Sequence, residues 1–212
     1  VVKISSSSLK CQLTDQPPEV TRRVDNIGRA TDSMSAIVDR CIELERLDRG
    51  EQSIHLSECI LLDVVTALDV VCGADNLRLR IELNDVDSVL ADRHLLEVAL
   101  GNLLDNALKY ALPGTPITLR SDAEPRGGKP GFRLSVNNRV AAGSAPGAGQ
   151  VFVRYFRGAN AHDVSGTGLG LYLTRELARL QGGEAEYRYG TKGEVSFSIW
   201  LPAPDYPPEA GQ

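Results

Sequence analysis

A heptad repeat of apolar residues in residues 18 to 48 constrains the fold of this chain more than any other feature of its sequence. Spacings of four and three residues predict one long helix that packs in a coiled-coil-like bundle, with Thr31 at the one polar position. The repeat consists of Val20, Val24, Ile27, Met34, Val38 and Cys41. A second stripe at Ala30, Ile37 and Leu44 widens the apolar face, which favours a four-helix bundle over a two-stranded coil.

The segment before this helix predicts a shorter partner helix. "VVKISSSSLKCQL" carries Ile4, Leu9 and Leu13 at helical spacing, and the prolines of "TDQPPE" mark a turn because proline breaks a helix interior. One helical hairpin cannot close a four-helix bundle, whereas two chains can, so a homodimer is predicted. A hairpin packed on its own globular domain is the alternative.

After "LDRGEQ" the pattern becomes mixed α/β, which predicts an α+β fold with a two-layer α/β sandwich. Helices are expected at residues 56–74, 93–111 and 168–183, the first with Ser57 as its N-cap. Strands are expected at residues 77–83, 88–92, 116–122, 132–136, 184–190 and 194–202. The predicted domains are therefore a hairpin at 1–50 and a sandwich at 51–204, followed by a disordered Pro-rich tail at 205–212.

Composition excludes several classes of function. A net charge of −5 gives no electrostatic case for binding nucleic acid, and no apolar run approaches the roughly 20 residues needed to span a bilayer. The four cysteines are far apart and contain no CxxC, so structural thiols are expected. The three histidines do not cluster with them, which argues against zinc.

One predicted helix carries polar residues at regular spacing. In "EVALGNLLDNALKYA", Asn102, Asn106 and Lys109 lie within about 60° of one another, opposite an arc of leucines and alanines. The stripe is either a solvated face or a ligand-binding ridge. In the second case the amide oxygens suit a hard cation and the ammonium suits phosphate.

Two further stretches favour the ligand-binding interpretation. "SGTGLGLYLTRELA" puts Gly166, Gly168 and Gly170 directly before a helix, where free backbone amides bind anions. Just upstream, "FVRYFRGANAHD" interleaves aromatic residues with Arg154 and Arg157, which either reach phosphate or are solvated.

Together these stretches resemble the catalytic ATP-binding domain of bacterial sensor histidine kinases, in the superfamily that includes gyrase. "NLLDNALKYA" is similar to the N box, "FVRYFRG" to the F box and "GTGLGL" to the second glycine box, and the match runs from about residue 55 to 202. "RCIELERLDRGE" resembles the second helix of the dimerisation and histidine-phosphotransfer hairpin. The resemblance implies a Bergerat-type fold that binds ATP and Mg²⁺ in two-component signal transduction.

The resemblance also implies residue roles. Asn106 would hold Mg²⁺, Lys109 would contact phosphate and Tyr110 would line the nucleotide pocket. In relatives that hydrolyse ATP the position of Asn102 is a Glu that activates water, so an amide there favours transfer to a protein acceptor. The implied ATP site consists of Asn102, Asn106, Lys109, Tyr110, Asn138, Arg154, Phe156, Arg157, Gly166, Thr167, Gly168, Leu169 and Gly170.

The chain departs from the family in "VNNRVAAGSAPGAGQ", a loop expected to follow a strand that ends at Val136. Asn138 stands where the family has an Asp that reads the adenine amino group, and Val140 and Ala142 stand at two glycine positions. An Asn still accepts that hydrogen bond but loses its charge-assisted part, on the order of 1 kcal/mol. Weakened ATP binding is one interpretation, and a nucleotide-free scaffold that docks a response regulator is the other.

The second departure is the missing phosphoacceptor. No His precedes His55, and His55, His94 and His162 are expected to be surface or packing residues. The acceptor His is expected N-terminal to this chain, which is then a fragment; a natural chain without the acceptor is the alternative. By resemblance the partners are a second copy and a response regulator, and the parent protein is anchored in the bacterial inner membrane with this part in the cytoplasm.

Overall fold

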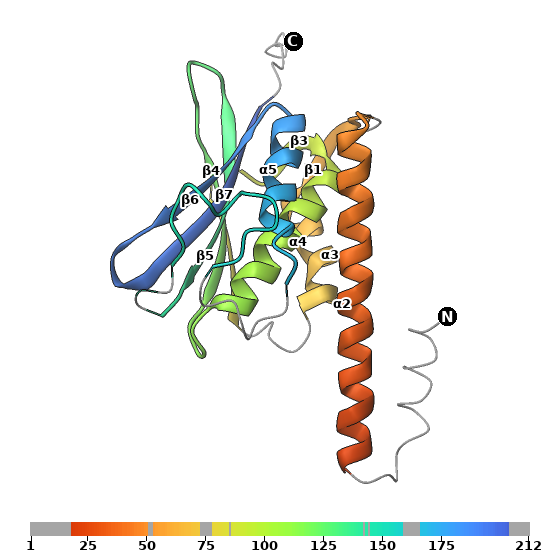
Figure 1. Cartoon of the computed structure of the whole chain (residues 1–212). Coiled ribbons are helices and arrows are strands. Elements are labelled where there is room, and N and C mark those ends of the chain that lie inside the picture. Colours follow the sequence, from red (N-terminus) through yellow and green to blue (C-terminus); the bar gives the residue numbers. More distant parts are fainter. Residues whose placement is uncertain are drawn as a thin grey trace. The chain divides into compact units, whose positions relative to one another are not determined.

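The computed structural model of the chain describes residues 18–50, 53–72, 78–84, 86–141, 143, 145–158 and 166–203 (Figure 1). The chain divides into two compact units, Val1–Glu51 and Gln52–Gln212. The predicted first helix of the hairpin, the predicted tail after residue 204, Ala142 and His162 lie outside the described residues.

The heptad segment forms one continuous helix, α2 (Pro18–Asp48) (Figure 1). Its polar seam residue is accommodated locally, because the Thr31 hydroxyl donates to the Ile27 carbonyl at 2.9 Å. Three apolar seam residues stay exposed in the single chain: Ile27 is 58%, Met34 67% and Val38 55% accessible. The helix therefore presents an apolar stripe to solvent.

The second unit is built on a five-stranded sheet of order β2-β4-β5-β7-β6. β2 (Leu79–Leu83) pairs parallel with β4 (Ile117–Ala123), and the other neighbours pair antiparallel: β5 (Gly131–Arg139), β7 (Glu194–Pro202) and β6 (Glu184–Tyr189). A separate antiparallel pair joins β1 (Leu56–Ile60) to β3 (Ser88–Asp92).

Three helices make the second layer: α3 (Leu61–Cys72), α4 (Arg93–Tyr110) and α5 (Gly170–Leu180) (Figure 1). Alternate residues of β5 face the helices, so Phe132, Leu134 and Val136 contribute to the core while Arg133, between Phe132 and Leu134, does not. Leu100 and Leu104 of α4 and Leu173 of α5 are buried in the same core. The two-layer α/β sandwich predicted from the sequence is confirmed.

Two local predictions were wrong. The helix expected to begin at Leu56 begins at Leu61, because residues 56–60 form β1; Ser57 pairs with Ala91 across the ladder and caps no helix. Since "LSECILLDVV" is an unbroken apolar run, its periodicity could not mark the change from strand to helix. The second error concerns β5, which continues beyond Val136 through Asn137, Asn138 and Arg139. These residues are held in the strand because each pairs with a residue of β7.

Candidate nucleotide site

The end of β5 lies against the C-terminal end of α4. The Leu112 amide, two residues after α4, donates to the Arg139 carbonyl at 2.7 Å. The Arg78 guanidinium holds the Leu112 carbonyl at 2.9 Å. Because Tyr110 ends the helix and Asn138 precedes Arg139, these bonds bring two predicted site residues to the same corner of the sandwich.

The start of α4 is fixed by Asp92, which the sequence analysis did not single out. One carboxylate oxygen accepts from the Leu95 amide at 3.1 Å as an N-cap, and the other accepts from the His55 amide at 2.8 Å. The Asp92 amide donates to the Gln181 side chain at 2.9 Å, just after α5. The signal was present in the sequence, because an Asp directly before a helix is a strong N-cap candidate.

Asn102 is buried, with 7% of its surface accessible, so this residue of the polar face of α4 is not solvated. It faces the start of α5: a Cβ built on Gly170 would lie 3.2 Å from the Asn102 Oδ1. The hydroxyl of Thr174 donates to the Gly170 carbonyl at 3.0 Å and lies 3.5 Å from the Ala99 carbonyl. The N-box-like helix α4 and the turn of residues 166–170, which we call the glycine turn, are therefore in direct contact.

The remaining polar residues of α4 lie toward its C-terminal end. Asn106 is half-buried, and Lys109 forms an ion pair with Asp105 at 2.8 Å. Burial raises the pKa of Tyr110, while the charge of Arg157 acts in the opposite direction. Arg157 is therefore near enough to Tyr110 to act on it electrostatically, although 47 residues separate them in the sequence.

The segment of residues 145–158, which we call the lid segment, is anchored at three points. Phe152 is buried and meets Phe197 of β7 edge to face, with ring centroids 6.4 Å apart. The Tyr187 hydroxyl of β6 donates to the Pro146 carbonyl at 3.2 Å. At its far end the Tyr155 amide donates to the Gly168 carbonyl at 3.0 Å.

The predicted cationic and aromatic residues of the lid segment differ in exposure. Arg154 lies over the rings of Tyr155 and Tyr172, 5.6 Å from each centroid. Phe156 is half-buried and Arg157 is exposed. Arg154 is thus packed against Tyr155 of the lid segment and Tyr172 of α5, whereas the side chain of Arg157 is accessible to solvent.

The glycine turn is open at its start and tight at its end. Gly166 is exposed, and the Thr167 hydroxyl accepts from the Leu169 amide at 3.4 Å. Gly168 has φ +70°, and a Cβ there would lie 2.6 Å from backbone atoms of Tyr155 and Phe156, so only glycine fits. No side chain of the described residues caps α5, whose first amides are the kind of donors that bind anions.

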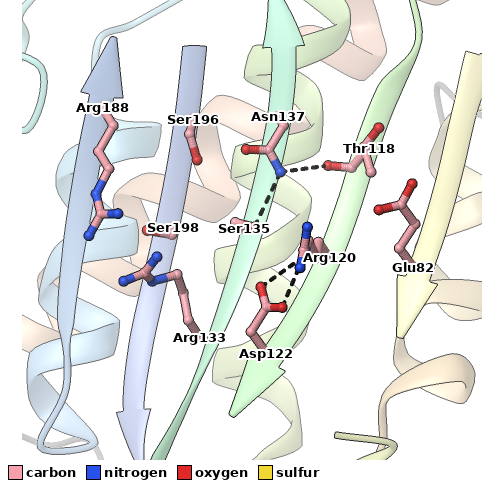
Figure 2. A pocket seen from close by; sticks show the side chains of 10 residues that line it. All are labelled: Glu82, Thr118, Arg120, Asp122, Arg133, Ser135, Asn137, Arg188, Ser196 and Ser198. Carbon is pink, nitrogen blue, oxygen red and sulfur yellow. Dashed lines mark hydrogen bonds and ion pairs between the residues drawn. The ribbon is translucent and has the colours of Figure 1, made fainter. Parts of the chain in front are cut away.

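Asn138 and Asn137 face opposite sides of the sheet. Asn138 is 5% accessible on the side of the sheet that the helices cover. No group of the described residues hydrogen-bonds to its side-chain amide. Asn137 is on the outer side (Figure 2), where its Nδ2 donates to Ser135 Oγ at 3.2 Å and to the Thr118 carbonyl at 3.4 Å. Val140, at the next inward position, is fixed by a 2.8 Å bond from its amide to the Gly193 carbonyl.

The open groove on the outer face of the sheet is a different surface. It has a volume of about 570 Å³, and the helices lie behind the strands in this view (Figure 2). The lining side chains are Glu82, Thr118, Arg120, Asp122, Arg133, Ser135, Asn137, Arg188, Ser196 and Ser198. None belongs to the predicted ATP site, and the Arg120–Asp122 ion pair (2.9 Å) within it shows that some of its charges are satisfied internally.

The described residues hold neither a cluster of metal-binding side chains nor a membrane-spanning helix. No group of three or more His, Cys, Asp or Glu side chains in that part of the chain is placed to hold a metal ion. No helix among the same residues is long and apolar enough to cross a membrane.

Comparison with known proteins identifies the family. Residues 91–205 match the family described as "Histidine kinase-, DNA gyrase B-, and HSP90-like ATPase". Sensor protein CreC of Escherichia coli is 29% identical over 189 residues, covering 87% of this chain and 39% of CreC. SenX3 of Mycolicibacterium smegmatis, a sensor-like histidine kinase, is 26% identical over 199 residues, covering 91% of this chain and 50% of SenX3.

A solved structure has the same fold. Full-length ShkA, crystallised in complex with AMPPNP, aligns over 96% of this chain and 46% of its own, with a TM-score of 0.65 and 18% identity. The chain belongs to the histidine kinase, gyrase B and HSP90-like ATPase family, and contains the catalytic ATP-binding domain of a sensor histidine kinase of two-component signalling. It spans about half or less of the length of the curated relatives it matches.

Proposed function

We propose that this chain is the catalytic core of a sensor histidine kinase that binds Mg-ATP and transfers the γ-phosphoryl group to a His outside the chain. From that His the phosphoryl group would pass to an Asp of a response regulator. The observation that carries the proposal is the convergence of three sequence-distant segments: Asn102 of α4 meets Gly170, and Tyr155 of the lid segment is bonded to Gly168. Each of the three carries residues whose chemistry suits a nucleoside triphosphate.

The phosphate end of the nucleotide would lie between α4 and the glycine turn. The uncapped start of α5 offers backbone amides to an anion, and Gly166, Thr167, Gly168, Leu169 and Gly170 would form the cradle. Arg157, Arg154 and Lys109 would neutralise phosphate charge. Lys109 forms a partly exposed ion pair with Asp105. A phosphate group can displace Asp105 from this pair, because exposed ion pairs contribute little free energy in water.

A magnesium ion fits this site with Asn106 as its protein ligand. Mg²⁺ characteristically binds one or two protein oxygens together with substrate phosphates and water, so a cage of carboxylates is not required. When bound, the ion would offset phosphate charge and orient the γ-phosphoryl group. Asn106 is half-buried and lies one helical turn after Asn102, so its amide oxygen can point to the same end of the nucleotide.

The same site disfavours hydrolysis. An amide cannot remove a proton from water, so Asn102 cannot act as a general base. Because Asn102 is buried against Gly170, it can instead position the phosphate chain next to the glycine turn. Transfer to a protein nucleophile then depends on positioning and charge stabilisation.

The exposed apolar seam of α2 supports a homodimer. Ile27, Met34 and Val38 form a stripe that a second copy of the helix would cover in a four-helix bundle. We place residues 1–50 in that dimerisation hairpin and residues 51–204 in the catalytic domain, within a parent protein whose other parts hold it at the membrane.

Calorimetric titration of the 212-residue chain with Mg-AMPPNP tests the nucleotide site. Binding in the micromolar range is expected, weakened at least tenfold by Asn106→Ala. The matched control is Asn84→Ala, since Asn84 is an exposed residue whose side-chain amide bonds only to Asp122 among the described residues. No binding at millimolar nucleotide would reject the kinase and leave a scaffold that docks a response regulator without nucleotide.

Phosphotransfer itself needs the longer protein. With γ-labelled ATP and Mg²⁺, the full-length protein should acquire acid-labile, base-stable label typical of phosphohistidine, and lose it to its response regulator. Steady release of inorganic phosphate without any labelled protein would instead indicate a hydrolase of the gyrase type.

A further inference from the structure

Asn138 is a buried residue beside the proposed nucleotide site, and no hydrogen bond from the described residues orients its side-chain amide. Only 5% of the residue is accessible, and within the described residues nothing hydrogen-bonds to its side chain. The oxygen and nitrogen of this amide are not among the fully buried atoms that lack a partner, so they remain accessible. An accessible amide without a partner in the described part of the chain is available to a ligand.

The position of Asn138 says which part of a ligand it meets. It precedes Arg139, whose carbonyl is bonded to Leu112 just beyond the C-terminal end of α4. The glycine turn, where the phosphates would bind, faces Asn102. Asn102 lies about two helical turns before the C-terminal end of α4. Two turns span about 11 Å, so Asn138 lies at the end of the site away from the phosphates, where the base of a nucleotide would be.

An amide differs from a carboxylate in what it can read. A carboxylate only accepts hydrogen bonds, so it suits the amino group of adenine and opposes the O6 oxygen of guanine. An asparagine offers an acceptor and a donor, and a half-turn of its amide exchanges them. One orientation matches the amino group and ring nitrogen of adenine, and the other matches the carbonyl and N–H of guanine.

Which orientation is available depends on the neighbours of the amide. Asn137 shows the fixed case: its Nδ2 donates to Ser135 Oγ and to the Thr118 carbonyl, so its oxygen and nitrogen have settled places (Figure 2). No such bonds hold Asn138. Its amide is therefore able to turn to suit whichever base is present.

We infer that Asn138 makes this a purine-tolerant site that binds guanine and adenine nucleotides with comparable affinity. The inference rests on the proposed nucleotide site and adds the substrate class that the site accepts. In physical terms, discrimination between the bases is lost because the Asn138 side-chain amide can satisfy either hydrogen-bonding pattern.

The test is calorimetric titration of the 212-residue chain with Mg-ADP and with Mg-GDP, followed by displacement of one by the other. The dissociation constants of the wild-type chain should agree within about tenfold, and each nucleotide should displace the other. Asn138→Asp should widen the preference for ADP by at least tenfold, because the carboxylate cannot donate to guanine.

Asn137→Asp is the matched control. It makes the same chemical change at the adjacent residue but on the outer face of the sheet, so the ratio of the two affinities should not move (Figure 2). Should Asn138→Asp fail to fold, Asn138→Ala gives the same test: both nucleotides weaken together and their ratio stays within about threefold of the wild-type ratio.

The outcomes separate the two proposals. ADP binding with GDP more than tenfold weaker in the wild-type chain would overturn purine tolerance and leave the ATP site intact. An unchanged ratio in Asn138→Asp would remove Asn138 from the base end. Failure of both nucleotides to bind would overturn the proposed function, and the inference with it.

Discussion

The backbone amide of Tyr155 donates a 3.0 Å hydrogen bond to the carbonyl of Gly168, and both residues have left-handed backbone angles, φ 65° and φ 70°. The contact joins the end of the lid segment to the turn that begins α5. A left-handed tyrosine is uncommon and costs on the order of 1 kcal/mol or more, so the surrounding structure must hold it there. The close backbone approach at Gly168 provides that restraint.

We therefore expect Gly168→Ala to disturb both stability and nucleotide binding. Its Cβ would lie 2.6 Å from backbone atoms of Tyr155 and Phe156, which no side-chain rotation can relieve. Thermal or urea unfolding should show a loss of about 1–3 kcal/mol, and the affinity for Mg-AMPPNP should fall at least tenfold.

Gly149→Ala is the matched control for that substitution. Gly149 lies in the same lid segment with no positive φ and no atom within 4 Å of a built Cβ, so it should behave like the wild-type chain in both assays. Equal losses in the two variants would show that the lid segment is merely sensitive to any added side chain.

Asp92→Ala should cost about 1–2 kcal/mol of unfolding free energy, because it removes the N-cap of α4 and the acceptor for the His55 amide. Ser57→Ala tests the alternative cap suggested by the sequence. Ser57 lies in β1, so its substitution should change stability by less than about 0.5 kcal/mol. Urea denaturation of both variants measures the difference, and a larger loss for Ser57→Ala would contradict the assignment of the cap.

The sequence predicted long periodic elements well and boundaries poorly. The heptad segment and the helix around Asn102 formed as expected, because a 3.6-residue apolar period repeated over several turns has no other regular solution. The start of the helix after Ile60 was missed, since "LSECI" and "LLDVV" are both apolar and only pairing with β3 makes the first a strand. Tertiary pairing decided that boundary.

The candidate site shows the same division. Motifs identified the segments that meet. The sequence could not decide whether the polar stripe of the N-box helix is a solvated face or a ligand-binding ridge. Burial of Asn102 against Gly170 excludes the solvated alternative for that residue. The opposite facing of Asn137 and Asn138 also followed only once β5 was seen to continue through them, because residues of a strand alternate between its faces.

Val38→Lys should dissociate the proposed dimer. Val38 is 55% accessible on the apolar seam of α2, so a lysine there would place a charge in the bundle core. The dimer dissociation constant measured by sedimentation should rise at least tenfold, about 1.4 kcal/mol. Asp39→Lys introduces the same side chain about 140° around the helix from Met34, at an exposed residue, and should leave self-association unchanged. A wild-type chain that stays monomeric at high concentration would refute the dimer.

We predict that the free energy of unfolding depends on pH through Glu124, whose carboxylate is bonded to Arg133 of the outer face of the sheet. Burial acts to raise its pKa, but hydrogen bonds from Arg126 and Arg133 outweigh burial and lower the pKa below its ordinary value. The folded state therefore favours the carboxylate, and this stabilisation is present above the unfolded-state pKa and lost as the pH falls through the folded-state pKa. Glu124→Gln should cost about 1 kcal/mol at pH 7, and the deficit should shrink toward pH 3, as followed by urea denaturation.

Glu82→Gln, on the same face but with no ion pair among the described residues, should change stability by less than about 0.5 kcal/mol at pH 7. A deficit for Glu124→Gln that stays constant with pH would mean that the ion pairs with Arg126 and Arg133 do not stabilise the fold.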